Sequence, residues 1–112
     1  MKTKNSDFIG TWNIYEMEMW DEDYFNMEGQ AQIVIEKNKR GEFKFGLIYG
    51  EIDGTFTEHK NEKILEFTWY GGDDQSEMSG SGWVKLKELD ILEGEIRIHH
   101  RDSSKILARR AD

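Results

Sequence analysis

Short runs of alternating apolar and polar residues fill this chain, and they constrain its fold more than any other feature. Eleven glycines and no proline are spread along the 112 residues, and most runs lie between glycines or polar turns. Strict alternation puts apolar side chains on one face of an extended strand, which is typical of half-buried antiparallel strands. The pattern predicts eight strands, at residues 8–19, 29–37, 41–49, 51–58, 63–70, 77–86, 91–99 and 104–110.

Eight short strands at even spacing predict one all-β domain over residues 1–112, an eight-stranded antiparallel up-and-down barrel. The acidic stretch 21–27 can form one helical turn, because carboxylates suit a helix N-terminus. Polar or glycine-rich turns are expected at 38–41, 58–62, 70–74 and 87–90.

The parity of the apolar residues predicts which side chains face the interior. In the first strand the parity changes from Trp12 and Ile14 to Met17 and Met19, so we expect a β-bulge near Tyr15. The large residues expected inside are Trp12, Phe43, Phe45, Leu47, Tyr49, Ile52, Phe56, Leu65, Phe67, Trp69, Met78, Val84 and Leu86. An eight-stranded barrel is only just wide enough for such side chains, so we expect a packed interior with at most a shallow pocket.

The stretch Phe8-Ile9-Gly10-Thr11-Trp12 resembles the start of calycin-superfamily proteins, which include lipocalins, fatty-acid-binding proteins and avidins. The resemblance implies a small barrel whose first-strand Trp12 closes one end. It also implies that a last-strand arginine, Arg109 or Arg110, stacks on Trp12 in a cation–π contact. Residues 20–28 are too few for the helical lid of fatty-acid-binding proteins, and the biotin-binding loop of avidins is missing after Asn13.

A second resemblance covers most of the chain and is to a set of small uncharacterised bacterial proteins. They share a Gly-Thr-Trp start, a Trp-Asp element, an acidic glycine-containing loop after a tryptophan, and a Gly-x-Gly-Trp sequence. The matching residues here are Gly10-Thr11-Trp12, Trp20-Asp21, Trp69 with 71–74, and Gly80-Ser81-Gly82-Trp83. This resemblance brings no assigned function.

The position of Trp12 orients the predicted barrel, because alternate loops of an up-and-down barrel gather at the same end. The Trp12 end would hold both termini and the basic residues Lys2, Lys4, Lys37, Lys39, Arg40, Lys60, Lys63, Lys87, Arg109 and Arg110. The opposite end would hold two histidines and many acids: Asp21, Glu22, Asp23, Glu28, Glu51, Asp53, Asp73, Asp74, Glu77, Asp102, His99 and His100. We therefore predict an acidic mouth opposite Trp12.

Charge and composition narrow the function classes. The net charge of −8 repels phosphate backbones, so we expect no nucleic-acid partner, and it favours cationic ligands. The absence of cysteine excludes disulfides and zinc–thiolate sites. No apolar run approaches the roughly 20 residues of a membrane span, and residues 1–7 lack the apolar segment of a signal peptide, so we expect a cytoplasmic protein.

Catalytic and metal sites find little support in the sequence. The acids of 21–23 and 73–74 offer oxygen ligands for Ca²⁺ or Mg²⁺, but their spacing matches no EF-hand, and we interpret them as solvated turns. His99 and His100 are adjacent on a predicted strand, so we expect them to point to opposite faces and not to share a metal. We predict no cofactor, no metal and no catalytic residue, and an enzyme is the less favoured class.

The leading hypothesis is a non-enzymatic binding protein that engages a small or cationic ligand at the acidic mouth. Its candidate residues are Asp21, Asp23, Tyr49, Trp69, Asp73, Asp74 and His100. The alternative is an interaction or regulatory module that forms a homodimer or binds a protein partner through an apolar patch on the outer wall. The outward-facing candidates for that patch are Val34, Ile48, Ile64, Tyr70 and Trp83.

Overall fold

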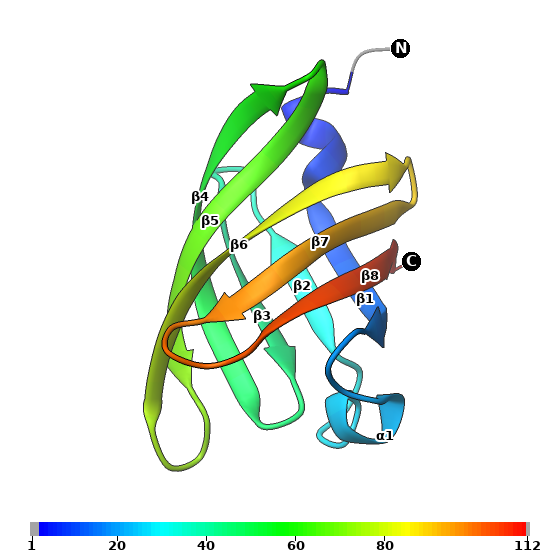
Figure 1. Cartoon of the computed structure of the whole chain (residues 1–112). Coiled ribbons are helices and arrows are strands. Elements are labelled where there is room, and N and C mark those ends of the chain that lie inside the picture. The colour runs from blue at the N-terminus through cyan, green and yellow to red at the C-terminus, as the bar shows by residue number, and fades with distance from the viewer. Residues whose placement is uncertain (1–2, 112) are drawn as a thin grey trace.

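A computed structural model describes residues 3–111 as a closed barrel of eight antiparallel strands in sequential order (Figure 1). The strands are β1 (Gly10–Met17), β2 (Gln32–Ile35), β3 (Arg40–Phe45), β4 (Ile48–His59), β5 (Glu62–Gly72), β6 (Glu77–Glu88), β7 (Ile91–Ile98) and β8 (Ser103–Arg110). A short 3-10 helix, η1 (Asn5–Phe8), precedes β1, and one helical turn, α1 (Glu22–Phe25), follows it. The predicted all-β barrel and the predicted helical turn are confirmed, and Lys2 lies outside the described residues.

The predicted bulge in the first strand is also confirmed. β1 pairs with β8 in a register that shifts between Ile14 and Glu16, which leaves Tyr15 as the extra residue. The bulge restores the inward direction at Met17, which is buried. The prediction is wrong for Met19, which follows the end of β1 and is 48% exposed.

The prediction of one strand through residues 41–49 is wrong, because a two-residue turn divides this region. β3 ends at Phe45, which pairs with Ile48 at the start of β4, so only Gly46 and Leu47 form the turn. Gly46 has φ +57°, a conformation that glycine adopts without steric cost. The turn reverses the expected parity, so Ile48 is buried and Tyr49 lies outside, 55% exposed.

The loop between β5 and β6 is also shifted from its predicted position. Gly71 and Gly72 belong to β5, and the loop comprises residues 73–76. The carbonyl oxygens of Tyr49 and Ser76 lie where a side chain on Gly71 or Gly72 would stand. These glycines therefore permit close strand approach, and the acids after them form the loop.

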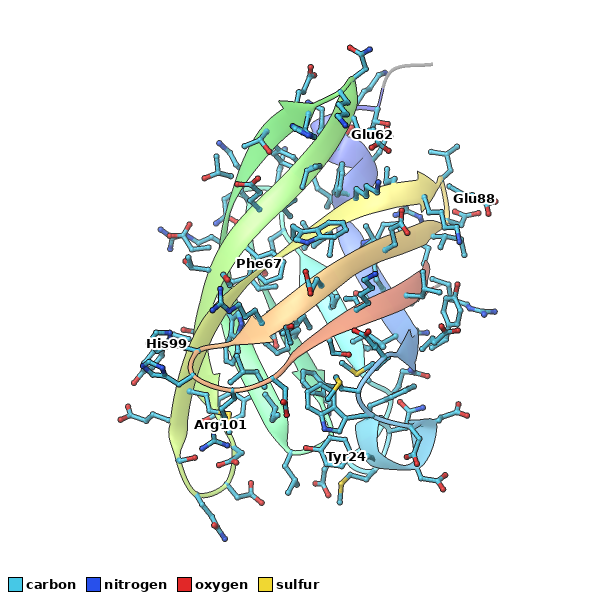
Figure 2. The ribbon with its side chains drawn as sticks, in the orientation of Figure 1. Tyr24, Glu62, Phe67, Glu88, His99 and Arg101 are labelled. Carbon is cyan, nitrogen blue, oxygen red and sulfur yellow. The ribbon has the colours of Figure 1, made fainter. Side chains whose placement is uncertain are left out.

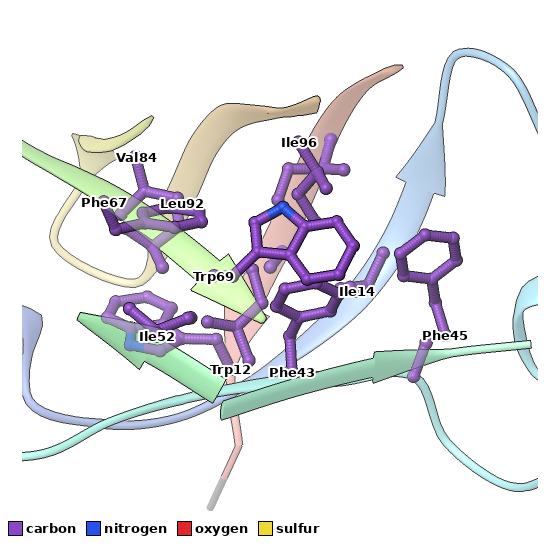
Figure 3. Close-up of a cluster of buried hydrophobic side chains, with 14 of the residues drawn as sticks. Trp12, Ile14, Phe43, Phe45, Ile52, Phe67, Trp69, Val84, Leu92 and Ile96 are labelled. Atoms are coloured by element: carbon purple, nitrogen blue, oxygen red, sulfur yellow. The ribbon is translucent and has the colours of Figure 1, made fainter. Parts of the chain in front are cut away.

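Aromatic and branched side chains fill the barrel interior (Figure 3). Trp69 meets Phe43 edge-on with ring centroids 5.0 Å apart, and Phe43 stacks on Phe45 at 5.9 Å. Gly50 and Gly80 make room for the Trp69 ring, because a side chain on either would collide with it. This arrangement matches the crowded interior that the sequence predicts.

Arg110, rather than Arg109, stacks on the first-strand tryptophan. The Arg110 guanidinium carbon lies 4.2 Å from the centroid of the Trp12 ring, and these two residues are register partners across β1 and β8. Arg109 faces the outer wall, where its guanidinium lies 4.1 Å from the Tyr15 ring. Trp12 is fully buried and donates its indole N–H to the Phe8 carbonyl at 3.0 Å.

The Arg110 guanidinium also joins separate segments at the Trp12 end. It donates to the backbone carbonyls of Asp7 at 2.9 Å, Ile9 at 3.3 Å and Leu89 at 3.0 Å. The first two belong to the N-terminal segment, and Leu89 belongs to the β6–β7 turn. Phe8, at the end of η1, is fully buried beneath them. One side chain thus connects both ends of the described chain and a distant turn.

The predicted loop order is confirmed. η1, the end of β8 and the β2–β3, β4–β5 and β6–β7 turns gather at the Trp12 end, and α1 lies at the opposite end (Figure 1). Two acids assigned to that opposite end lie elsewhere. Asp53 is the register partner of Arg40 at the start of β3, and Glu51 lies on the outer wall opposite Glu42.

Candidate functional site

The segment after β1 covers the end of the barrel where the acidic mouth was predicted. The Asp21 carboxylate caps α1 by accepting the Tyr24 backbone N–H at 3.1 Å. Phe25 is 2% exposed, and its carbonyl accepts the Gly46 N–H at 2.9 Å. Asp23 is exposed on the same turn. The two predicted ligand-binding acids of this segment therefore stand on the outside of a cap.

Aromatic stacking holds this cap against the barrel. The Trp20 ring lies 6.1 Å from the Tyr24 ring and 5.1 Å from the Phe45 ring, centroid to centroid. Tyr24 packs directly on Gly46. Met19 and Met27 flank the cap and are 48% and 51% exposed. The rings close this end, and the methionines add apolar surface beside the acids.

Trp69, another predicted mouth residue, belongs to the core. It is 3% exposed, and its indole N–H donates to the Arg97 carbonyl at 3.1 Å. Within residues 3–111, every buried side-chain nitrogen or oxygen has a hydrogen-bond partner. The described interior therefore presents no unpaired polar group to a ligand.

Asp73 organises the β5–β6 loop. Its carboxylate accepts the backbone N–H groups of Gln75 at 2.9 Å and Ser76 at 2.8 Å, and the Ser76 hydroxyl at 3.2 Å. These hydrogen bonds, that from Gln75 first, lower the pKa of Asp73, and the charge of nearby Arg101 adds to the effect. Asp74 is exposed beside it. The loop therefore has a defined shape, and Arg101 lies close enough to Asp73 to act on its charge.

The two adjacent histidines do not point to opposite faces, so that expectation is wrong. β7 ends at Ile98, and His99 and His100 lie in the β7–β8 turn with their ring centroids 3.9 Å apart. His100 has φ +64°, and a turn backbone does not follow the alternation of a strand. Figure 2 shows Arg101 on the side of the β5–β6 loop and Tyr24 beside α1. The predicted site residues thus form separate groups around this end.

Metal binding has no preformed site in the described part of the chain. No three of its His, Asp or Glu side chains gather into a group that could hold a metal ion.

Residues 3–111 also include no helix with the length and apolar character needed to cross a bilayer.

A groove on the outer wall, next to the acidic end, brings together two exposed tyrosines. Tyr49 on β4 and Tyr70 on β5 are 55% and 56% exposed and stand diagonally across the strand pair. They line a groove of about 470 Å³ together with Glu42, Glu51 and Glu77. We call this site the tyrosine groove.

The tyrosine groove is negatively charged. Its lining holds Glu42, Glu51 and Glu77 against one cation, Lys44, whose ammonium donates to the Glu28 carbonyl at 3.3 Å. Glu42 is the register partner of Glu51, and like charges in directly opposite positions destabilise a sheet. The Tyr70 hydroxyl donates to Glu77, and this hydrogen bond raises the pKa of Tyr70.

The sequence pattern predicts only part of this groove. Tyr70 was expected on the outer wall, but Tyr49 was expected inside and Glu51 at the rim. The signal that was missed is Gly46, because a glycine in a two-residue turn resets the parity of the next strand. Recognising that turn would have placed Tyr49 and Glu51 on the outer wall beside Tyr70.

A second groove, of about 510 Å³, lies on the other side of the barrel over β6, β7, β8 and β1. Partly buried Trp83 and Leu107 supply its apolar lining, and we call it the tryptophan groove. Its charged residues are evenly divided: Lys85, Lys87, Lys105, Glu16, Glu18 and Glu93. The Trp83 indole N–H donates to Glu95 at 3.3 Å. The two grooves therefore differ in charge as well as in position.

Comparison of the chain with protein-family models, with curated proteins and with solved structures found no match. The two grooves and the two ends of the barrel are therefore the features that bear on function.

Proposed function

We propose that this protein is a non-enzymatic binding protein that recognises a cationic group in the tyrosine groove, at the edge of its acidic end. The observation that carries the proposal is the pairing of two half-exposed tyrosines with three glutamates around one groove. The ligand class is an organic ammonium or guanidinium, either a small amine or a lysine or arginine side chain. The leading hypothesis from the sequence placed a small or cationic ligand at the acidic mouth, and the tyrosine groove lies on the adjoining outer wall.

The two tyrosines suit a cation because the face of an aromatic ring attracts positive charge. Tyr15 offers a comparison within the same barrel, since Arg109 already covers its ring at 4.1 Å. In the described chain no cation–π contact covers Tyr49 or Tyr70. Their rings are thus free to receive a cation from outside.

The glutamates support the same ligand class. Glu42 and Glu51 stand directly opposite each other, and no ion pair neutralises either of them within residues 3–111. A bound cation would relieve their mutual repulsion and gain attraction from both. Asp73 and Asp74, in the loop that follows β5, add negative charge to the same end of the barrel.

The eight-stranded barrel and the Gly10-Thr11-Trp12 opening support a calycin-like relationship, which we include in the proposal together with a bacterial source and a cytoplasmic setting. An apolar ligand inside the barrel is not part of it, because side chains fill the interior. Nucleic acid is not an expected partner, because the net charge of −8 repels phosphates.

Titration of the ¹⁵N-labelled full chain with tetramethylammonium, methylguanidinium and lysine amide tests the proposal by NMR. We expect amide shifts at Tyr49, Glu51, Tyr70 and Glu77 with millimolar affinity, since an exposed cation–π contact contributes only about 0.5–1 kcal/mol. Added salt should weaken the binding by screening the glutamates. Butyrate, an anion of similar size, should leave these amides unchanged.

Matched variants separate the groove from general surface charge. Tyr49→Leu and Tyr70→Leu should each remove most of the response, whereas Tyr15→Leu should preserve it because Arg109 already occupies that ring. Glu51→Gln should weaken binding, and Glu58→Gln, an exposed acid at the β4–β5 tip, should not. The proposal fails if no cation shifts the groove amides, or if both tyrosine variants respond like the original chain.

A further inference from the structure

We infer that the tryptophan groove is the contact surface for a second copy of this chain, in a weak two-fold symmetric dimer. The inference is independent of the cationic ligand, because the two grooves lie on different parts of the wall and share no residue. It also accounts for the outward position of Trp83, whose ring edge donates a hydrogen bond to Glu95 within the barrel.

The lining of the tryptophan groove is apolar at its centre. Trp83 on β6 and Leu107 on β8 are both only partly exposed, and the backbone of Gly94 lies between them on β7. Ile91, at the start of β7, is also outward and partly buried. Such a patch, surrounded by charged side chains, has the composition of a small protein interface.

The charges around this centre follow the strands in an alternating order. One continuous cross-strand row runs Lys85, Glu93, Leu107 and Glu16, from β6 through β7 and β8 to β1. The neighbouring row places Glu95 opposite Lys105 across β7 and β8. Lysines therefore stand on β6 and β8, and glutamates stand on β7 and β1.

This order is complementary to itself. A two-fold axis that runs parallel to the strands, over the seam between β7 and β8, exchanges β6 with β1 and β7 with β8. Lys85 of one copy then faces Glu16 of the other, Glu95 faces Lys105, and Glu93 lies against Leu107, and each contact occurs twice. The charge complementarity comes from the strand order and the register.

Net charge selects a second copy over other partners for this groove. A chain of net charge −8 repels its own copies over most of its surface. The lining of this groove is less repulsive, because its three lysines balance its three glutamates and only Glu95 is added beside them. A strongly basic or strongly acidic partner would meet like charges at many of these positions, whereas a second copy meets opposite charges at Lys85, Glu16, Glu95 and Lys105.

Lys85 can serve both the fold and the dimer. Its ammonium lies 3.2 Å from Glu62 and 3.6 Å from Glu93, and these carboxylates, Glu62 first, raise the pKa of Lys85. The side chain is still 23% exposed, and an ammonium has three N–H donors. A carboxylate from the second copy can therefore join the existing pair at the rim.

The size of the face sets the expected affinity. Four strands about 4.8 Å apart and at least eight residues long present a face of at most roughly 19 by 26 Å, or about 500 Å², because the wall of a closed barrel curves. Two such faces would bury at most about 1,000 Å² in total, which is the lower end for a specific interface. We therefore expect a dissociation constant in the micromolar range.

Sedimentation of the full chain from about 10 µM to about 1 mM tests this expectation directly. The expected result is a reversible monomer–dimer equilibrium that weakens with added salt, because the contacts are ion pairs at the rim. A chain that stays monomeric over the whole range would overturn the inference and leave the groove to a different partner.

Charge reversal then identifies the face and the symmetry. Lys85→Glu and Glu16→Lys each put like charges at both symmetric contacts, so each variant alone should dimerise at least about tenfold more weakly. Mixing the two variants restores opposite charges at both contacts, so the mixture should form a heterodimer. Lys37→Glu and Glu58→Lys make the same charge changes at exposed sites outside the groove and should dimerise like the original chain.

The reversal experiment remains decisive if one variant is less stable. Glu16 is exposed and forms no ion pair within residues 3–111, so Glu16→Lys tests the face without disturbing the Lys85–Glu62 pair. Circular dichroism of each variant verifies the fold. Dimers that persist in both folded charge-reversal variants, or a mixture that stays monomeric, would show that this face is not the interface.

Discussion

The two ends of this barrel are closed by different physical means. At the Trp12 end, Arg110 crosses from the last strand to the carbonyls of Asp7, Ile9 and Leu89, which belong to segments far apart in the chain. At the opposite end, α1 contacts the β3–β4 turn through Phe25 and Gly46, and this closure involves neither the first residues nor the last strand of the described chain. A closure that joins both ends of the chain, as Arg110 does over a separation of 103 residues, should be coupled to global folding, whereas a closure of shorter range can open by itself.

The two ends also differ in which side chains they leave available to a ligand. At the Trp12 end, the Arg110 guanidinium stacks on the Trp12 ring. Little of either group is therefore available to a ligand. The α1 closure leaves its acids outside and two methionines about half exposed. The proposed ligand site lies beside this second end, where Glu42 and Glu51 form no ion pair within residues 3–111.

Removing the tryptophan at the sealed end should have the largest effect. Trp12 is fully buried, so Trp12→Ala should lower the free energy of unfolding by about 3–5 kcal/mol, through lost burial and the cavity left behind. Urea denaturation measures the change. Trp83→Ala is the control, because Trp83 is only partly buried on the outer wall, and an equal loss in both variants would contradict the central role of Trp12.

Replacing Arg110 and Arg109 in turn should distinguish the contributions of these two last-strand arginines to stability. Arg110→Leu leaves three carbonyls without their charged donor and removes the contact with Trp12, so we expect a loss of about 2–3 kcal/mol. Arg109→Leu removes only the exposed contact with Tyr15 and should cost less than about 1 kcal/mol. Similar losses in the two variants would mean that the carbonyl contacts contribute little.

The α1 end should respond locally. Phe25 is 2% exposed, yet Phe25→Ala should lower global stability by only about 1–2 kcal/mol, less than an ordinary buried phenylalanine, because α1 can detach while the barrel stays folded. Native-state hydrogen exchange should show loss of protection at the Gly46 amide, which donates to the Phe25 carbonyl. Equal loss of protection across β1–β8 would contradict a local closure.

The sequence predicted the barrel and its orientation because these depend on repeated local signals. Alternation identifies strands, turn residues separate them, and the shift from Ile14 to Met17 reveals the bulge at Tyr15. The orientation of the barrel could be predicted because the stretch Gly10-Thr11-Trp12 resembles calycin openings, in which the tryptophan closes one end. The choice of Arg110 over Arg109 depends on the β1–β8 register, which alternation within each strand does not fix.

The candidate sites were less predictable because they combine distant strands. One unrecognised two-residue turn at Gly46 moved Tyr49 from the expected interior to the outer wall. The order of lysines and glutamates in the tryptophan groove depends on the registers of β6, β7, β8 and β1, which no single segment encodes. His99 and His100 were misplaced because the strand ended one residue earlier than its pattern suggested.

A smaller effect should follow loss of the helix cap at the acidic end. Asp21 accepts the Tyr24 backbone N–H, so Asp21→Ala should cost about 0.5–1 kcal/mol, in the lower range for N-caps because α1 is a single turn. Asp23→Ala removes a charge from the same turn without removing a cap. Thermal unfolding of the two variants distinguishes capping from charge, and equal shifts in Tm would assign the effect to charge alone.

The smallest effect concerns the acid range and the β5–β6 loop at the same end. Backbone hydrogen bonds hold the pKa of Asp73 below its ordinary value of 3.8, so the folded state favours the charged carboxylate. The stabilisation is therefore fully present above about pH 3.8 and is lost as the pH falls through the lowered pKa of the folded state. The Tm difference between the original chain and Asp73→Asn should be present at neutral pH and should narrow in acid. Asp74→Asn removes a neighbouring charge that accepts no hydrogen bond among the described residues, and an NMR titration that gives Asp73 a pKa of 3.8 or higher would contradict the role of this loop.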